Sequence, residues 1–154
     1  MMDNFTLRTV VMSAILSAAL GLAYPAAETP SPTIAARPCT TGSPVVTAGY
    51  TIKYAPAVPT GRFDDGYQPE QAWSKDHVVG TYTFGVPEPV ESGFAYAQFK
   101  CQYYCNGGPD AGSFFVNYAG AGQGSLCSCF DDLLEPESFV SNNQTMVGAW
   151  NHIC

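Results

Sequence analysis

Cysteine is the residue type with the greatest capacity for chemistry in this chain, which has six cysteines in 154 residues. Four of them fall in one stretch, as Cys101-x3-Cys105 and Cys127-x-Cys129. Paired thiols form disulfides or hold a metal ion, and structural zinc sites use Cys pairs with two to four residues between them. A Cys-x-Cys pair strains a single tetrahedral site, and an even cysteine count favours disulfides. We therefore expect disulfides, and neither a metal site nor a cofactor.

The spacing of these cysteines fits two different secondary structures. Cys101 and Cys105 are four residues apart in a helix-like stretch, so both leave the same helical face. Cys127 and Cys129 are two residues apart in a strand-like stretch, which points both to one side of a sheet. Two cross-links between these pairs would fix a helix onto a sheet, and explain the cysteines more simply than a redox role for Cys127-Ser128-Cys129. The residues alone leave all three pairings of the four cysteines open.

The elements that must position the cysteines follow from periodicity and turn signals. An amphipathic helix is expected from near Phe94, capped by Ser92 and stopped at Asn106-Gly107. A short helical turn is expected near Pro69–Trp73. Strands are predicted at Gly49–Tyr54, Val78–Gly85, Ser113–Tyr118, Leu126–Phe130 and in the C-terminal segment, where Trp150 points inward. The predicted fold class is α+β: a small disulfide-rich domain with one α-helix packed on an antiparallel β-sheet.

The first residues have the pattern of a secretory signal peptide. Arg8 precedes the apolar run Thr9–Ala23, whose 15 residues are short for a bilayer crossing, which needs about 20. We expect a signal peptide over residues 1–23, a Pro/Thr/Ser-rich lead-in over 24–48 and the folded domain over 49–154. The expected product is secreted, extracellular or held in a cell wall, with no membrane span after signal cleavage.

The charge of the chain argues against polyanionic partners. Its formal net charge is −7, and the bases that follow the expected signal peptide are scattered. They are Arg37, Lys53, Arg62, Lys75 and Lys100. Without a basic stripe, nucleic acid and anionic membrane surfaces are disfavoured as partners. Low charge with many aromatic residues favours a neutral extracellular ligand.

Four aromatic side chains are candidates for binding such a ligand. Tyr67, Trp73, Tyr96 and Tyr103 lie off the cysteine stripe or in loops, where a ring can stack on the apolar face of a sugar. Ordinary packing is the alternative role for each of them. Asn143 opens the sequon Asn143-Gln144-Thr145, which predicts N-glycosylation in a secreted chain.

The sequence gives little support to catalysis. It has no Gly-x-Ser-x-Gly elbow, no His-Glu-x-x-His pair and no phosphate-cradling loop. Asp131, Asp132, Glu135 and Glu137 could supply the two acids of a glycosidase, but a solvated turn explains them as well. We expect a protein that is not an enzyme. Two alternatives stay open: a small secreted hydrolase that uses these acids, and a structural or effector-type secreted protein without sugar affinity.

The order of these motifs resembles a known domain family. Cys101-x3-Cys105, the aromatic strand Ser113–Tyr118 and Cys127-x-Cys129 together resemble the PAN/apple-like domains of secreted proteins, including fungal ones, over about Tyr50–Cys154. The Cys-x3-Cys helix, followed by Tyr118–Gly120 and Cys-x-Cys, is also similar to the WSC carbohydrate-binding module, our second choice.

The resemblance implies a disulfide pattern and a function. In apple domains a cysteine-bearing helix is bridged to the central sheet, and a further bridge ties the termini, which here would be Cys39–Cys154. The preferred helix-to-sheet order is nested, Cys101–Cys129 with Cys105–Cys127. Both families imply binding of carbohydrate or of an extracellular protein without catalysis. The oligomeric state is left open.

Overall fold

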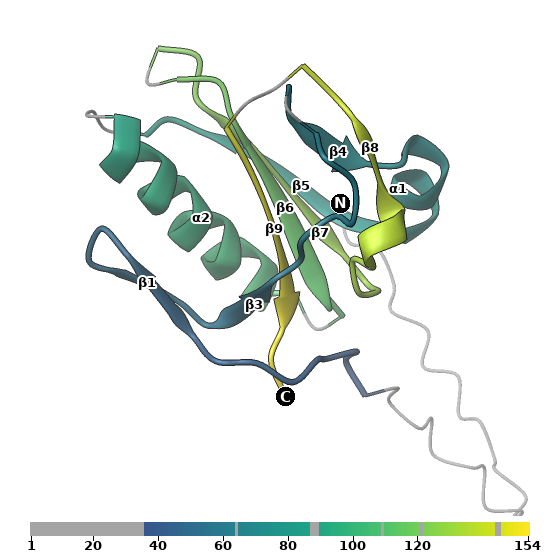
Figure 1. Cartoon of the computed structure of the whole chain (residues 1–154). Coiled ribbons are helices and arrows are strands. Elements are labelled where there is room, and N and C mark those ends of the chain that lie inside the picture. The colour runs from purple at the N-terminus through teal and green to yellow at the C-terminus, as the bar shows by residue number, and fades with distance from the viewer. Residues whose placement is uncertain (1–35, 64, 87–89, 109, 121, 144–145) are drawn as a thin grey trace, which may run out of the picture. The chain divides into compact units, whose positions relative to one another are not determined.

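The computed structural model describes residues 36–154 except residues 64, 87–89, 109, 121 and 144–145 (Figure 1). The expected signal peptide and the first part of the expected lead-in lie outside the described residues. The helices are α1 (Gln71–His77), α2 (Val90–Asn106) and a short 3-10 turn, η1 (Pro136–Ser138). The strands are β1 (Val45–Thr47), β2 (Tyr50–Ile52), β3 (Tyr54–Pro56), β4 (Tyr67–Pro69), β5 (Val78–Phe84), β6 (Ser113–Tyr118), β7 (Ser125–Phe130), β8 (Phe139–Ser141) and β9 (Val147–His152). Among the described residues, no helix combines the length and apolar character that a bilayer crossing requires.

A five-stranded antiparallel sheet forms the centre of the fold, with strand order β3-β9-β6-β7-β5. The α+β class is therefore confirmed. β6 has the predicted bounds, and β5 and β7 each lie within one residue of them. Trp150 of β9 is buried and stacks on Phe114 of β6 at a centroid distance of 6.2 Å, so its predicted inward position is also confirmed.

The first predicted strand, Gly49–Tyr54, is instead split into β2 and β3. β2 pairs with β1 in a hairpin whose two turn residues, Ala48 and Gly49, have φ of 46° and 82°, as a two-residue hairpin turn requires. At Lys53 the backbone N–H donates to the Gln102 side chain of α2 instead of to a strand. The chain then joins the edge of the central sheet as β3.

Helix α2 covers the side of the central sheet that we call the first face (Figure 1). It begins at Val90, so Ser92 lies in its first turn and the predicted Ser92 cap is wrong. It ends at Asn106 as predicted, where the Arg37 side chain donates to the Gly108 carbonyl and, at 3.5 Å, to Asn106 Oδ1. A cation at this position stabilises the negative end of the helix dipole.

The core between α2 and the first face is aromatic and sulfur-rich. Tyr54 lies edge-on to Phe114, with ring centroids 4.9 Å apart, and its hydroxyl donates to Asn106 Oδ1 at 2.9 Å. Burial raises the pKa of Tyr54, so this phenol stays a donor at physiological pH. Other buried members are Ile52, Val86, Ala97, Cys101, Cys105, Ala111, Val116, Tyr118, Cys127, Cys129 and Trp150.

The opposite side of the sheet, the second face, carries a smaller and separate core. Figure 1 shows the β4–β8 ribbon and α1 on this side, away from α2. The buried members are Ala57, Phe115, Phe130, Leu134, Phe139 and Ala149. The expectation of one helix is thus corrected to two, since the segment predicted as a turn near Pro69–Trp73 continues as α1 to His77. Glu70 makes this helix possible, because its carboxylate accepts from the Trp73 N–H at 2.9 Å and caps the first turn.

A disulfide joins Cys39 to Cys154, which confirms the expected terminal bridge. Beside it, the Thr40 N–H donates to the His152 carbonyl at 2.8 Å, and the Cys154 N–H donates to the Thr40 carbonyl at 3.1 Å. Together with β1, these contacts make the described part of the expected lead-in an integral part of the ordered domain.

The two helix-to-sheet disulfides are Cys101–Cys127 and Cys105–Cys129, so the nested order was wrong. Chain direction explains the observed order. β6 returns along α2, and β7 is antiparallel to β6, so β7 runs in the same direction as the helix. The first cysteine of the helix, Cys101, therefore pairs with the first cysteine of the strand, Cys127. Four helical residues rise about 6 Å and two strand residues about 6.7 Å, so the two cysteine spacings match across the interface.

Candidate functional site

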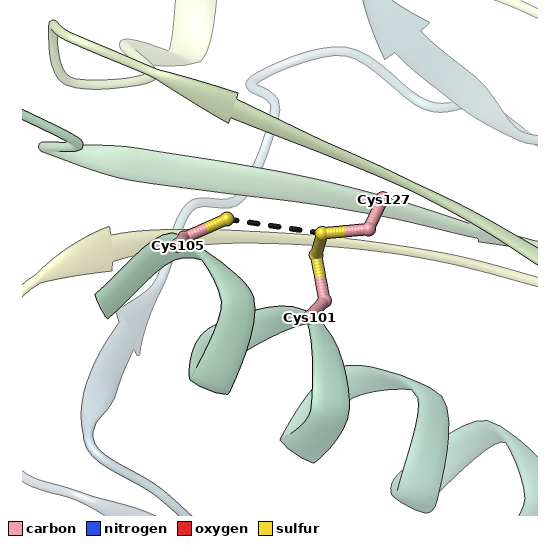
Figure 2. Close-up of side chains that lie close together, drawn as sticks. All are labelled: Cys101, Cys105 and Cys127. Atoms are coloured by element: carbon pink, nitrogen blue, oxygen red, sulfur yellow. Dashed lines mark hydrogen bonds between the residues drawn. A yellow bond between two sulfur atoms is a disulfide. The ribbon is translucent and has the colours of Figure 1, made fainter. Parts of the chain in front are cut away.

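The disulfide cluster is the group of possible metal ligands that lies close together in the described part of the chain. The sulfurs of Cys101, Cys105 and Cys127 lie within 4.8 Å of one another (Figure 2). All three belong to disulfides, so none offers the thiolate that a metal needs. Cys105 Sγ and Cys127 Sγ are 3.7 Å apart, a van der Waals contact because neither sulfur carries a proton. We assign these atoms a structural role.

The second face of the sheet holds an open groove of about 560 Å³. A further hollow of about 430 Å³ shares Asn117 and Leu126 with it and extends to the β6–β7 hairpin. We call both parts together the second-face groove. The larger part is lined by Gln68, Pro69, Gln71, Ser74, Lys75, Val78, Phe115, Asn117, Leu126, Ser128 and Phe130.

Strand alternation decides which side chains line this groove. Cys127 and Cys129 of β7 point to α2, so Leu126, Ser128 and Phe130 point to the opposite side. On β6, likewise, Phe114, Val116 and Tyr118 belong to the first-face core, while Phe115 and Asn117 line the groove. Cys127 and Cys129 point to the first face, where their disulfides attach α2. The same alternation therefore places Ser128 on the floor of the groove.

Helix α1 and strand β4 form the wall of the groove. The Trp73 ring packs on Phe130 and His77, with centroids 4.9 Å and 4.8 Å away. His77 Nδ1 lies 2.9 Å from Asp131 Oδ1, which connects the end of α1 to the residue after β7. Hydrogen bonds from the Trp73 and Ala72 amides lower the pKa of Glu70. The helix cap, the two ring contacts of Trp73 and the His77–Asp131 contact are all non-covalent.

The chemistry of the groove is neutral and mixed. Phe115 and Phe130 give it a buried aromatic floor. Its polar side chains are amides and hydroxyls, which both donate and accept hydrogen bonds. They are Gln68, Gln71, Ser74, Asn117 and Ser128 in the larger part, with Gln123 and Thr83 in the smaller. Lys75 is the one charged side chain among the described lining residues, and none of them is acidic.

Two of the four predicted ligand-binding aromatics lie on the second face, but in its core. Tyr67 contacts Phe139 and Phe115 at centroid distances of 5.2 Å and 6.2 Å, and burial raises its pKa. Trp73 supports the groove wall. Neither residue lines the groove, so packing, the alternative role, describes their contacts.

The other two predicted aromatics lie on α2, on the far side of the sheet. Tyr103 is 71% exposed, and Tyr96 is edge-on to Tyr50 at a centroid distance of 5.8 Å. Lys100 Nζ lies 5.5 Å from the Tyr96 ring centroid, and a hydrogen bond with Tyr96 raises the pKa of this lysine. The structure therefore divides the four predicted residues between two faces and brings them into no common site.

Sequence reasoning missed the polar residues of the groove, above all Asn117 and Ser128. Within the described residues, no hydrogen bond to either of these two side chains is found. The sequence contains a signal for each residue. Ser128 lies between two cysteines that share one face of a strand, so its side chain must point to the opposite face. Asn117 has the opposite parity to the apolar side chains Phe114 and Val116.

The acidic residues weighed for catalysis have local contacts outside the groove. Asp131 contacts His77, and Asp132 Oδ1 accepts from the Leu133 N–H at 2.8 Å. Glu135 caps the 3-10 turn η1 through reciprocal bonds with Ser138. These acids and Glu137 are exposed, and none lines the groove. Asn143 is exposed as well, and its glycosylation stays a prediction.

Comparison with known proteins adds no relative. No family model, no curated protein and no solved structure matches this chain. The likeness to PAN/apple-like domains therefore stays a prediction from the sequence.

Proposed function

We propose that this chain is a secreted, non-catalytic binding module of PAN/apple-like type that holds a neutral carbohydrate in the second-face groove. The observation that carries the proposal is the lining of that groove: amides and hydroxyls above a floor of Phe115 and Phe130, with one charged side chain and no acid among the described residues. Carbohydrate at a cell surface or wall is the ligand class that combines hydroxyls with apolar ring faces.

The size and chemistry of the groove support this choice. Ligand sites in proteins typically occupy about 300–1,000 Å³ and place a few polar groups over apolar walls. The larger part of the groove, at about 560 Å³, lies inside that range. A neutral sugar needs no counter-charge, so the near absence of charge in the lining costs no affinity. Among the described lining residues, a polyanionic ligand would meet Lys75 as the single cation, in a chain of net charge −7.

The disulfide pattern supports the family part of the proposal. Helix α2 is bridged twice to the central sheet and the terminal segments are bridged once, which is the arrangement that the resemblance implies. The bridges also rigidify the sheet that carries Asn117 and Ser128, so little conformational entropy is lost when a ligand binds.

A glycan array followed by calorimetry tests the proposal. We expect the wild-type protein to retain a neutral oligosaccharide without turnover. The double variant Asn117→Ala/Ser128→Ala should bind about five- to 150-fold more weakly, since the two lost hydrogen bonds together contribute about 1–3 kcal/mol. The matched control is Ser141→Ala, a hydroxyl removed from an exposed position on β8, which should leave affinity unchanged.

Three outcomes would contradict the proposal in different ways. Loss of binding in Tyr103→Ala, with the groove variant unaffected, would move the site to α2. Hydrolysis of the oligosaccharide that Asp131→Asn or Glu135→Gln abolishes would support the hydrolase hypothesis. An array without any retained glycan would favour the structural or effector-type role.

A further inference from the structure

Strand β5 forms one edge of the central sheet, and none of the described residues covers it with a further strand. It is the last strand in the sheet order and pairs with β7 on one side only. Its seven residues, VVGTYTF, include no charge and no proline, and Val79 and Val78 are 50% and 42% exposed. The opposite edge strand, β3, has three residues and ends in Pro56. Soluble proteins shield long edge strands with charges, prolines or covering segments, and β5 has none of these within its own span.

The outer backbone of β5 offers a row of hydrogen-bonding groups. No described residue pairs with that side of the strand. The pairing of β5 with β7 shifts its register between Val78 and Gly80, so the regular part of the ladder extends over Gly80–Phe84. Free N–H and C=O groups along such a ladder accept a further strand, by the same bonds that hold the sheet together.

We propose that a second copy of this chain pairs with β5, antiparallel and centred on Tyr82. The two-fold arrangement would place Gly80 opposite Phe84 of the second copy, and Thr81 opposite Thr83. Residues that face each other then lie on the same face of the joined sheet. Two threonines meet in this register, which is a favourable cross-strand pair, while Gly80 is already covered by the Tyr82 ring of its own chain. The paired segment has no charge, so the net charge of −7 introduces no like-charge contact within it.

The aromatic side chains beside β5 favour a protein partner over solvent. Tyr82 stacks on Tyr104 of α2 at 4.7 Å and 10°, and Tyr103 lies next in line at a centroid distance of 6.2 Å. A two-fold axis perpendicular to the sheet puts both α2 helices on the same side, so these rings extend the contact beyond the strands. Tyrosine-rich surfaces are typical of interface cores, and this one includes a single cation near the named rings, Lys100, whose Nζ lies 5.9 Å from the Tyr104 centroid and 5.4 Å from that of Phe84. The strand ladder alone would fall short of the roughly 1,200–2,000 Å² of a stable interface.

Sedimentation equilibrium on the secreted protein tests the proposal. The wild type should show twice the monomer mass at micromolar to millimolar concentrations. Thr81→Lys/Thr83→Lys should weaken dimerisation at least about tenfold, because lysines on an edge strand oppose pairing. The matched control Thr51→Lys adds a lysine to an exposed position of β2 and should leave the dimer unchanged. Circular dichroism would verify that each variant is folded.

A charge-swap experiment tests the register itself. Thr81→Glu/Thr83→Glu should fail to self-associate but should form a heterodimer when mixed with Thr81→Lys/Thr83→Lys, since unlike charges then face each other across the junction. A monomeric wild type would overturn the proposal. So would an equal loss in Thr51→Lys, or folded charge variants that do not associate on mixing. None of these readouts depends on a sugar, so they fail or succeed independently of the proposed function.

Discussion

The two faces of the central sheet are closed in different ways. On the first face, α2 is fixed by two disulfides and buries a continuous core of rings and sulfur. On the second face, the β4–β8 ribbon and α1 are attached by non-covalent contacts, which include packing, the Glu70 cap and the His77–Asp131 contact, and they leave a groove uncovered. Covalent attachment of one layer lets a small domain keep part of the opposite layer open, because the rigidity of the sheet no longer depends on full coverage.

The largest expected effect is on the cross-linked face. The double variant Cys101→Ala/Cys127→Ala should lose about 3–5 kcal/mol of unfolding free energy. Removing the bridge releases the loop between the two cysteines in the unfolded chain, and the missing sulfur atoms leave cavities in the core. Denaturant unfolding without reductant measures the loss. If the variant unfolds at nearly the wild-type midpoint, the disulfides are not what rigidifies the sheet, and the contrast between the two faces is lost.

The second expected effect is on the non-covalent wall. Trp73 is half-buried against Phe130 and His77, so Trp73→Ala should cost about 2 kcal/mol, less than full burial of a tryptophan would imply. We expect it to loosen α1 and weaken ligand binding at the same time. Trp73→Phe keeps a ring at this position and should recover most of both quantities in parallel unfolding and binding measurements.

A smaller effect is expected at the cap of α1. Glu70→Ala removes the carboxylate that accepts from the Trp73 N–H, so it should lower the melting temperature by less than Trp73→Ala does. The pKa of Glu70 is lowered in the fold, so its contribution is present above the unfolded carboxyl pKa and is lost as pH falls through the lower folded value. Melting curves of wild type and Glu70→Ala should therefore converge in acid. A constant difference between them would assign the effect to another cause.

The smallest expected effect is a pH dependence at His152. Burial first, and then the nearby charge of Arg37, lowers its pKa below the ordinary value of 6.5. Because the fold favours the neutral ring, His152 contributes to the stability of the fold. This contribution is complete above pH 6.5 and is lost as the pH falls through the lower pKa of the folded state. His152→Gln should flatten this part of the melting profile. An unchanged profile would show that other groups produce the slope.

The sequence predicts the first face better than the second for a physical reason. Period-2 alternation in β6 and β7 and the Asn106-Gly107 stop of α2 are local signals, and the cysteine parity ties them together. The true bridge order also follows from local connections, since β6 and β7 are successive antiparallel returns after α2. The nested prediction overlooked that direction.

The second face depends on contacts between segments that are distant in the chain and show no period. Tyr67–Pro69 pairs with Phe139–Ser141, and Leu134 is buried in a segment without helical or strand-like alternation. The prediction of binding residues also favoured aromatic rings, whereas the groove exposes the amide and hydroxyl of Asn117 and Ser128. Tyr67 and Trp73 instead support the groove from its core and wall.

The most direct test of the division between the faces is amide shift mapping by NMR, with nitrogen-labelled protein and a neutral oligosaccharide retained on the array. We predict that shifts concentrate at Gln71, Asn117 and Ser128, and that Ala97 of α2 and Phe114 and Val116 of β6, which α2 covers, stay unchanged. Shifts centred on Tyr96 and Tyr103, with the groove residues unaffected, would contradict the assignment of the second face as the binding surface.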